Sequence, residues 1–122
     1  MKLRALRGAI TVEANDAKAI LGATEELLRA MVDRNGLEHD DIVSCLFTCT
    51  PDLNAEFPAV AARQIGMSDV PLMCAQEMDV YGQMPHVIRV MMHCYPQQED
   101  RKPEHVYLRD ASKLRLDLAG AQ

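Results

Sequence analysis

The segment HVIRVMMHC, residues 86–94, constrains the fold of this chain more than any other stretch. Its large apolar residues occupy both alternating sets of positions, so neither side of a strand built from them can face water. The segment is therefore predicted to be a strand that is covered on both faces. Arg89 lies in the middle of it, and a buried guanidinium costs several kcal/mol unless another group compensates its charge. The fold must supply both a cover for this strand and a partner for this charge.

The N-terminal part of the chain has a strand pattern followed by a helix pattern. Residues 2–12, KLRALRGAITV, are predicted to form a strand, in which Arg7 lies on a face of otherwise small or apolar groups. Apolar side chains then recur three and four residues apart between residues 17 and 32, which predicts a helix. The expected ends of this helix are Asn15 or Asp16 as the N-cap and Gly36 as the C-terminal stop.

The rest of the chain contains more strand patterns than helix patterns. A short helix is predicted to begin at Pro58 and to end at Gly66, because proline suits the first turn of a helix and glycine its end. Segments 70–80 and 86–95 are separated by a short turn and are predicted to be antiparallel neighbours. The strands predicted after the first helix are 42–50, 70–80, 86–95 and 105–108.

This order of elements predicts an α+β fold with a small mixed β-sheet and helices on one face. A chain of 122 residues is expected to form one domain over residues 1–122, with a tail, residues 113–122, that is either a helical turn or mobile. A single helical layer leaves the other face of the sheet uncovered. Eight methionines with no tryptophan suit an apolar face that meets another subunit, so an oligomer is predicted.

Charge and composition argue against several classes of function. The formal net charge of −5 disfavours nucleic acid as a partner, because that class needs a clustered basic face. No apolar run is long enough to span a membrane and no signal peptide is recognisable, so a cytoplasmic protein is expected. The four cysteines form no CxxC pair and are expected to be reduced thiols. No Cys or His pair has the spacing of metal ligands and no cofactor motif occurs, so neither a metal nor a cofactor is predicted.

Three charged residues, Arg7, Glu77 and Arg89, interrupt apolar strand patterns. The simplest interpretation is an ion pair between Glu77 and one arginine that holds adjacent strands in register. One carboxylate cannot neutralise two guanidinium groups, so a small anionic ligand would complete the balance unless Asp79 supplies the second negative charge. Arginine is also the residue that binds a planar carboxylate through two parallel hydrogen bonds. The sequence therefore predicts an arginine-lined site for a small anion.

Cys74 has two interpretations. It lies three residues before Glu77, so the two side chains belong to opposite faces of the strand unless the strand bulges or ends between them. A nucleophilic Cys74 would need a base such as His86 or His93, and the ordinary alternative is a small buried hydrophobe. Other candidates also have an ordinary structural role, namely Tyr107 in the core and Arg63 and Arg115 in solvent.

The sequence as a whole resembles a known family, the small monofunctional chorismate mutases of the bacterial trimeric α/β-barrel class. The similar stretches are RALRGAITVE, TPDLNAEFPAVAARQIGM, VPLMCAQEMDV, IRVMM, HVYL and LRLDL, which occur in family order and together cover nearly the whole chain. The resemblance implies a homotrimer, assembled as a pseudo-α/β-barrel. It also implies the intramolecular rearrangement of chorismate to prephenate, which leads to phenylalanine and tyrosine and requires no cofactor.

The resemblance further implies a role for each residue of the site. Arg89 would point at the ether oxygen of chorismate, while Arg7 and Tyr107 hold its side-chain carboxylate. Glu77 and Cys74 would contact the ring hydroxyl, with Glu77 as an acceptor rather than a general base. The pocket would lie between subunits, with Phe57, Ala59 and Arg63 supplied by the neighbour and Leu114 and Arg115 of the tail near its mouth.

Three positions depart from the family pattern. Val60 stands where a charged residue is common, Glu104 replaces a basic residue, and Leu116 replaces a proline. None of them belongs to the inner part of the site. Two other functions remain open from the residues: a noncatalytic trimer that binds a small carboxylate metabolite as a sensor, and an imine-deaminating enzyme of similar trimeric shape, which the stretches quoted above do not resemble.

Overall fold

The computed structural model describes residues 1–116 of the chain and confirms the predicted order of elements. Within the predicted tail, residues 113–116 belong to a short helix, and residues 117–122 lie outside the described residues. The strand predicted over residues 70–80 is shorter than expected. The strands are β1 (Arg4–Thr11), β2 (Ile42–Cys49), β3 (Leu72–Gln76), β4 (Val87–Cys94) and β5 (Val106–Leu108); the helices are α1 (Ala17–Arg34), α2 (Ala59–Gln64) and α3 (Ser112–Leu116), with 3-10 turns at His39–Asp41 and Arg109–Ala111.

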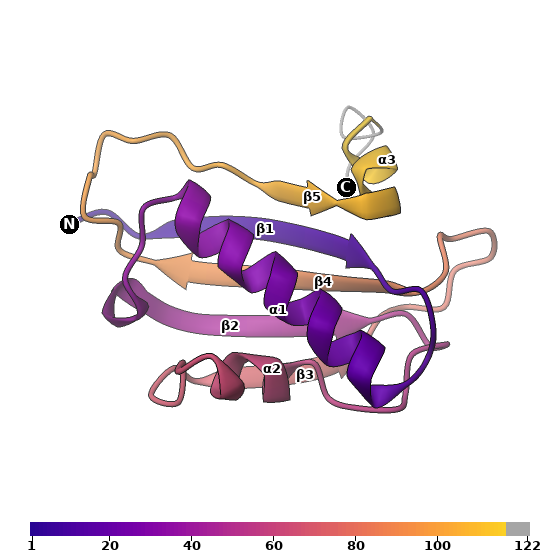
Figure 1. Cartoon of the computed structure of the whole chain (residues 1–122). Helices are drawn as coiled ribbons and strands as arrows, with labels where there is room; N and C mark the ends of the chain where they lie inside the picture. The colour runs from indigo at the N-terminus through magenta and orange to yellow at the C-terminus, as the bar shows by residue number, and fades with distance from the viewer. Residues whose placement is uncertain (117–122) are drawn as a thin grey trace.

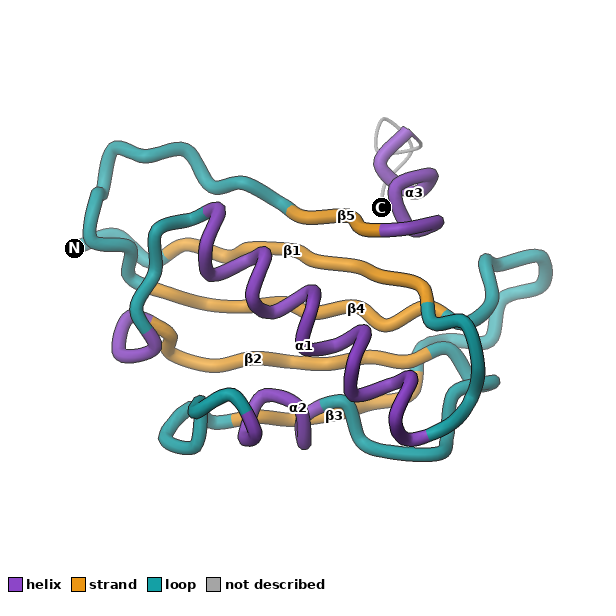
Figure 2. The backbone as a smooth tube through the Cα atoms, viewed as in Figure 1, coloured by secondary structure: helices purple, strands orange, loops and turns teal. Residues whose placement is uncertain are grey.

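The strands form one mixed sheet in the order β3-β2-β4-β1-β5. The central strand β4 is antiparallel to both of its neighbours, whereas β3 and β5 each run parallel to the strand beside them. Helices α1 and α2 lie on the same side of this sheet, with α1 running obliquely across the strands and α2 next to β3 (Figures 1 and 2). The predicted α+β class, with a mixed sheet and helices on one face, is therefore confirmed.

The prediction that segments 70–80 and 86–95 are neighbouring strands is wrong. Strand β2 lies between β3 and β4 and pairs with both of them. A parallel neighbour requires a crossover connection, and α2 provides it between β2 and β3. Strand β4, which is apolar on both faces, then takes the centre of the sheet, where its two edges are both paired.

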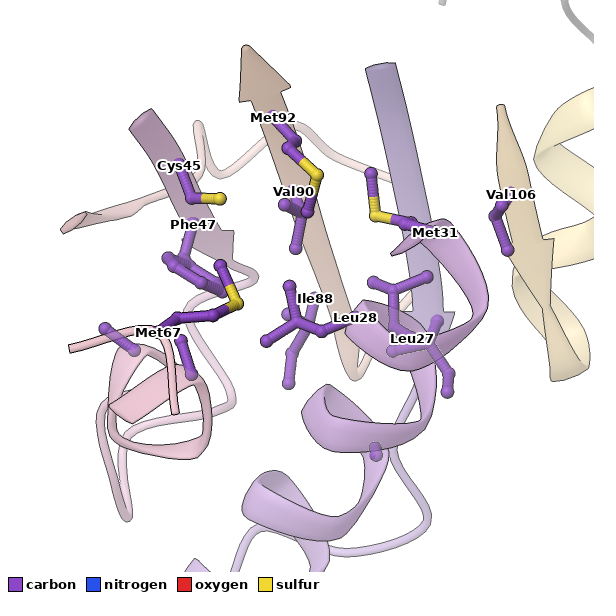
Figure 3. Packing of buried hydrophobic residues seen from close by; sticks show 14 of the residues in the cluster. Leu27, Leu28, Met31, Cys45, Phe47, Met67, Ile88, Val90, Met92 and Val106 are labelled. Atoms are coloured by element: carbon purple, nitrogen blue, oxygen red, sulfur yellow. The ribbon is translucent and has the colours of Figure 1, made fainter. Parts of the chain in front are cut away.

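The main core lies between the sheet and α1 (Figure 3). Along β4 the even-numbered residues face this core, and they meet side chains from α1 and β2. Thr24, the polar residue on the buried face of α1, donates its hydroxyl to the carbonyl of Ile20 at 2.7 Å, so its burial leaves no unpaired group. The large side chains that fill this layer include Leu27, Leu28, Met31, Phe47, Ile88 and Met92.

The ends of the helices follow the predicted signals. Asp16 is the N-cap of α1, and its carboxylate accepts a hydrogen bond from the amide of Ala19 at 2.8 Å. Gly36 has a φ of 62° just after the helix, a conformation that favours glycine. Pro58 is the N-cap of α2, and Gly66 follows this helix with a φ of 98°.

Gly8 allows α1 to approach the sheet closely. A Cβ atom at Gly8 would overlap the sulfur of Met31 and lie 3.1 Å from Cδ1 of Leu27, and both of these side chains are fully buried. The Gly8→Ala variant is expected to lose about 1–3 kcal/mol of unfolding free energy, because overpacking forces such a core to shift.

Gly22 provides the matched control for this prediction. It lies on the exposed side of α1, and nothing stands within 4 Å of a Cβ placed there. Gly22→Ala should therefore gain about 0.4–1 kcal/mol of stability. Urea unfolding of both variants checks the pair, and equal stability of Gly8→Ala and the wild type would contradict the close packing at β1.

Candidate active site

The face of the sheet opposite α1, which we call the open face, carries a row of residues that crosses four strands. In the strand register Thr48 of β2 lies opposite Arg89 of β4, Arg89 lies opposite Ala9 of β1, and Ala9 lies opposite Tyr107 of β5. Residues that pair in this way project from the same face of a sheet. Arg89 and Tyr107, which are 18 residues apart in the sequence, are therefore brought to one face with the small Ala9 between them.

Glu77 completes the row from the end of β3. Its Oε1 atom accepts a hydrogen bond from Nε of Arg89 at 2.9 Å, and its Oε2 atom accepts one from the hydroxyl of Thr48, also at 2.9 Å. The side chain of Arg89 is 31% exposed and that of Glu77 is 18% exposed. The predicted ion pair between Glu77 and one arginine is thus present. It uses only Nε of the guanidinium, and the two terminal nitrogens of Arg89 bind no other group among the described residues.

Arg7 lies on the same face, on the strand next to Arg89. It pairs with Met91 in the register of β1 and β4, which makes it a diagonal neighbour of Arg89. Diagonal positions of this kind have Cα atoms about 7–8 Å apart, within reach of two long side chains that bind one ligand. Asp79, the alternative partner, is exposed, and its carboxylate forms no ion pair with residues 1–116. The two arginines and Tyr107 therefore border one area of the open face.

The side chain of Cys74 lies on the other side of the sheet. It packs against the main core, while strand β3 ends at Gln76 before the chain reaches Glu77. The two histidines considered as bases make other contacts: His86 Nδ1 lies 3.0 Å from the carbonyl oxygen of Val12, and His93 Nδ1 lies 3.3 Å from the hydroxyl of Ser44. Cys74 thus fits the interpretation as a small apolar residue, and any contact with a ligand on the open face would have to come from its backbone.

The buried thiols are also poor nucleophiles. Burial raises the pKa of Cys45 to about 12, and burial together with the nearby Cys74, Glu77 and Asp52 does the same for Cys49. Burial likewise raises the pKa of Cys94. All four cysteines are free, and at neutral pH these three remain protonated, whereas the thiolate is the reactive form.

The residues expected to serve a neighbouring subunit lie away from the open face. Phe57 is 67% exposed in the loop before α2, and Arg63 is exposed on α2, on the helical side of the sheet. The side chain of Ala59 is buried in the core of its own chain, so only its backbone could contact a ligand.

Leu114 of α3 packs against a small cluster formed by Ala9, Val87, Tyr107 and Ala111, and Arg115 lies in the same helix.

The departures at Glu104 and Val60 lie outside the row on the open face. Glu104 binds Asn35 through its backbone, and its carboxylate lies 3.9 Å from Arg34 at the surface. Val60 is half-buried on α2. Within residues 1–116, no group of three or more His, Cys, Asp and Glu side chains could hold a metal ion. None of the helices in this part of the chain is long and apolar enough to cross a membrane.

The residue that sequence reasoning missed is Thr48. A threonine in a strand is ordinary, because β-branched residues are common there. Nothing in the sequence sets Thr48 apart, and only the registers of β2 with β3 and with β4 place its hydroxyl beside Glu77 and next to Arg89. A correct prediction of the strand order would have been needed to find it.

Comparisons with known proteins agree on one family over almost the whole chain. Residues 3–118 match the family described as chorismate mutase type I. The chain is 47% identical to chorismate mutase AroH of Thermus thermophilus over 98% of its own length and 99% of that protein. It is 42% identical to chorismate mutase AroH of Bacillus subtilis, with 98% and 94% covered. A solved chorismate mutase from Clostridium thermocellum superposes with a TM-score of 0.87 at 47% identity and covers 90% of this chain and 98% of its own.

Proposed function

Because this chain belongs to the chorismate mutase type I family, we propose that the row of residues on its open sheet face is the site where chorismate rearranges to prephenate. The chain is an isomerase of that family, so the interpretations as a sensor or as an imine-deaminating enzyme are set aside. The observation that carries the assignment of the site is the position of Arg89, which is held through Nε by Glu77 while its terminal nitrogens bind no other group within residues 1–116.

The reaction makes two demands on the protein. Chorismate is a flexible dianion that must be held in a compact chair, and its breaking ether bond places negative charge on the oxygen. Holding the reactive shape removes much of the entropic barrier, and a fixed positive charge at the oxygen stabilises the transition state. No bond to the protein forms and no proton has to move, so the reaction requires neither a nucleophile nor a general base.

Arg89 is proposed to bind the ether oxygen. The bond from its Nε atom to Glu77 fixes the plane of the guanidinium, which keeps the terminal nitrogens available for substrate. Val87 and Met91, the neighbours of Arg89 on the same face of β4, are apolar, and a second subunit over this face would further limit access of water. Electrostatic stabilisation is stronger in such surroundings than in water.

Arg7 and Tyr107 are proposed to hold the side-chain carboxylate of chorismate. Both lie on the same face as Arg89, with Arg7 two residues before Ala9 on β1 and Tyr107 opposite Ala9 on β5, and the guanidinium of Arg7 suits a planar carboxylate. Glu77 is proposed to accept a hydrogen bond from the ring hydroxyl. Each carboxylate oxygen has two lone pairs, so Glu77 can accept a further bond besides those from Arg89 and Thr48.

The remaining residues of the pocket are proposed to come from a second copy of the chain, in a homotrimer. Ala59 and Arg63 belong to α2 on the helical side of the sheet, and Phe57 directly precedes this helix, so these residues suit the site of a neighbour rather than their own. The open face also carries an apolar row, in which Met73, Leu46 and Met91 pair across three strands. Met73 is 64% exposed and Leu46 43% in the single chain, as expected for a face that another subunit covers.

Three further expectations remain proposals. Leu114 packs beside Tyr107, and this contact supports the proposal that the tail segment containing Arg115 lies near the mouth of the pocket. Cys74 would contact the ring hydroxyl through its backbone. The free thiols are consistent with a reducing compartment, so we place the enzyme in the cytoplasm.

The direct test is an assay of the purified protein with chorismate. We expect loss of chorismate and formation of prephenate in buffer that contains a chelator and no added cofactor, since neither demand of the reaction requires one. Buffer without protein gives the background rate. The absence of turnover above that background at micromolar enzyme would overturn the proposed function.

A further inference from the structure

Thr48 occupies a special position on the open face. It lies on β2 between the strand that carries Arg89 and the strand that precedes Glu77, and it pairs with Arg89 in one register and with Ala75 in the other. Its hydroxyl is half-buried and donates to Oε2 of Glu77 at 2.9 Å. Thr48 therefore contacts the partner of Arg89 without lying next to the area that Arg7 and Tyr107 border.

Glu77 depends on side-chain contacts for its orientation. It follows the last residue of β3, and its backbone amide donates to the carbonyl of Cys49 at 2.8 Å. Beyond that bond its side chain reaches back across β2 to β4, and a free glutamate loses about 1.5–2 kcal/mol of rotamer entropy when it is fixed. A single bond from Arg89 to one oxygen would still allow the carboxylate to turn about its last torsion angle. The second bond, from Thr48 to the other oxygen, stops that rotation.

We propose that Thr48 is a positioning residue of this enzyme, whose hydroxyl fixes the carboxylate of Glu77 and through it the plane of the Arg89 guanidinium. The inference rests on the roles proposed above for Glu77 and Arg89. The alternative explanation is that a threonine is present at position 48 only for its β-branched shape, which suits a half-buried strand position. Valine has that shape without the hydroxyl, so the two explanations predict different results for the same substitution.

The Thr48→Val variant is expected to lose about ten- to a hundredfold in kcat/KM, as expected for one hydrogen bond to a charged group. Thr48→Ser, which restores the hydroxyl, should return to within about threefold of the wild type. Thr24→Val is the matched control: it makes the same change on the far side of the sheet, where the hydroxyl binds only the carbonyl of Ile20. Its activity should equal that of the wild type.

A double-mutant cycle shows whether the effect passes through Glu77. In the Glu77→Ala background, Thr48→Val should change kcat/KM by less than about twofold, since its partner has been removed. The proposal is overturned if Thr48→Val keeps wild-type activity, if Thr48→Ser is as impaired as Thr48→Val, or if the same loss appears without Glu77. Wild-type turnover with an unimpaired Thr48→Val overturns this inference alone. No turnover by the wild type overturns the proposed function and this inference together.

Discussion

The Arg89→Met variant is expected to lose at least about a thousandfold in kcat while it keeps the fold of the wild type. A preorganised donor that carries a full charge is worth about 4 kcal/mol or more at a developing negative charge, and each 1.36 kcal/mol is a factor of ten in rate, so about 4 kcal/mol corresponds to about a thousandfold. Methionine keeps most of the volume of the arginine stem, so the central strand stays packed. Prephenate formation by the purified variant measures the loss directly.

Two further variants distinguish the loss of the Arg89 charge from a loss of the folded structure. Arg89→Met leaves the carboxylate of Glu77, which is 18% exposed, without its cation, and this can lower stability. The double variant Arg89→Met/Glu77→Gln removes both charges and should be folded and equally inactive. Arg29→Met makes the same substitution in an exposed pair with Glu25 on α1 and should keep full activity. A folded Arg89→Met protein that retains most of its activity would refute the role of Arg89.

Two impaired variants are expected to restore activity when they share one copy of the proposed trimer. If each pocket takes Arg89 from one subunit and Arg63 from the next, a subunit with Arg63→Ala still offers Arg89 to a neighbour with Arg89→Met. With equal and random mixing, about one quarter of the pockets contain both arginines, so about one quarter of wild-type activity should return. Arg63→Ala alone should lose about ten- to a hundredfold, the value of one charged hydrogen bond.

The mixed trimers can be made by refolding the two variants together from urea. The control replaces the Arg63→Ala chain with the double variant Arg63→Ala/Arg89→Met, which offers no intact Arg89 and should restore nothing. If the site were built within a single chain, the mixture would show only the mean of the two separate activities. That result would remove Arg63 from the shared pocket and with it the main argument for a site between subunits.

The sequence predicts the elements well because their signals are local. The N-cap at Asp16, the stop at Gly36 and the proline at the start of α2 act within a few residues of themselves. The order of the strands in the sheet does not follow from local signals, because it depends on which strand can be paired on both edges. The short connection between β3 and β4 suggested that they are neighbours, but the crossover through α2 places β2 between them.

The same limit applies to the candidate site. Arg7, Glu77 and Arg89 stand out in the sequence because each charge interrupts an apolar pattern, and the structure brings them to one face. Thr48 could not be found in this way, since its role depends on pairing between strands. The residues expected from a neighbour are a further case, because a single chain shows only that they lie on the other side of the sheet.

The central place of β4 has a consequence for how long the site keeps its shape. Along most of their length both edges of Val87–Cys94 are paired, so the amides of this strand are expected to exchange with deuterated water only when the whole sheet opens. Arg89 therefore stands on the part of the chain that opens last, rather than on a loop that opens by itself. Local fluctuations should leave the guanidinium in place, and heating should abolish catalysis and amide protection in the same transition.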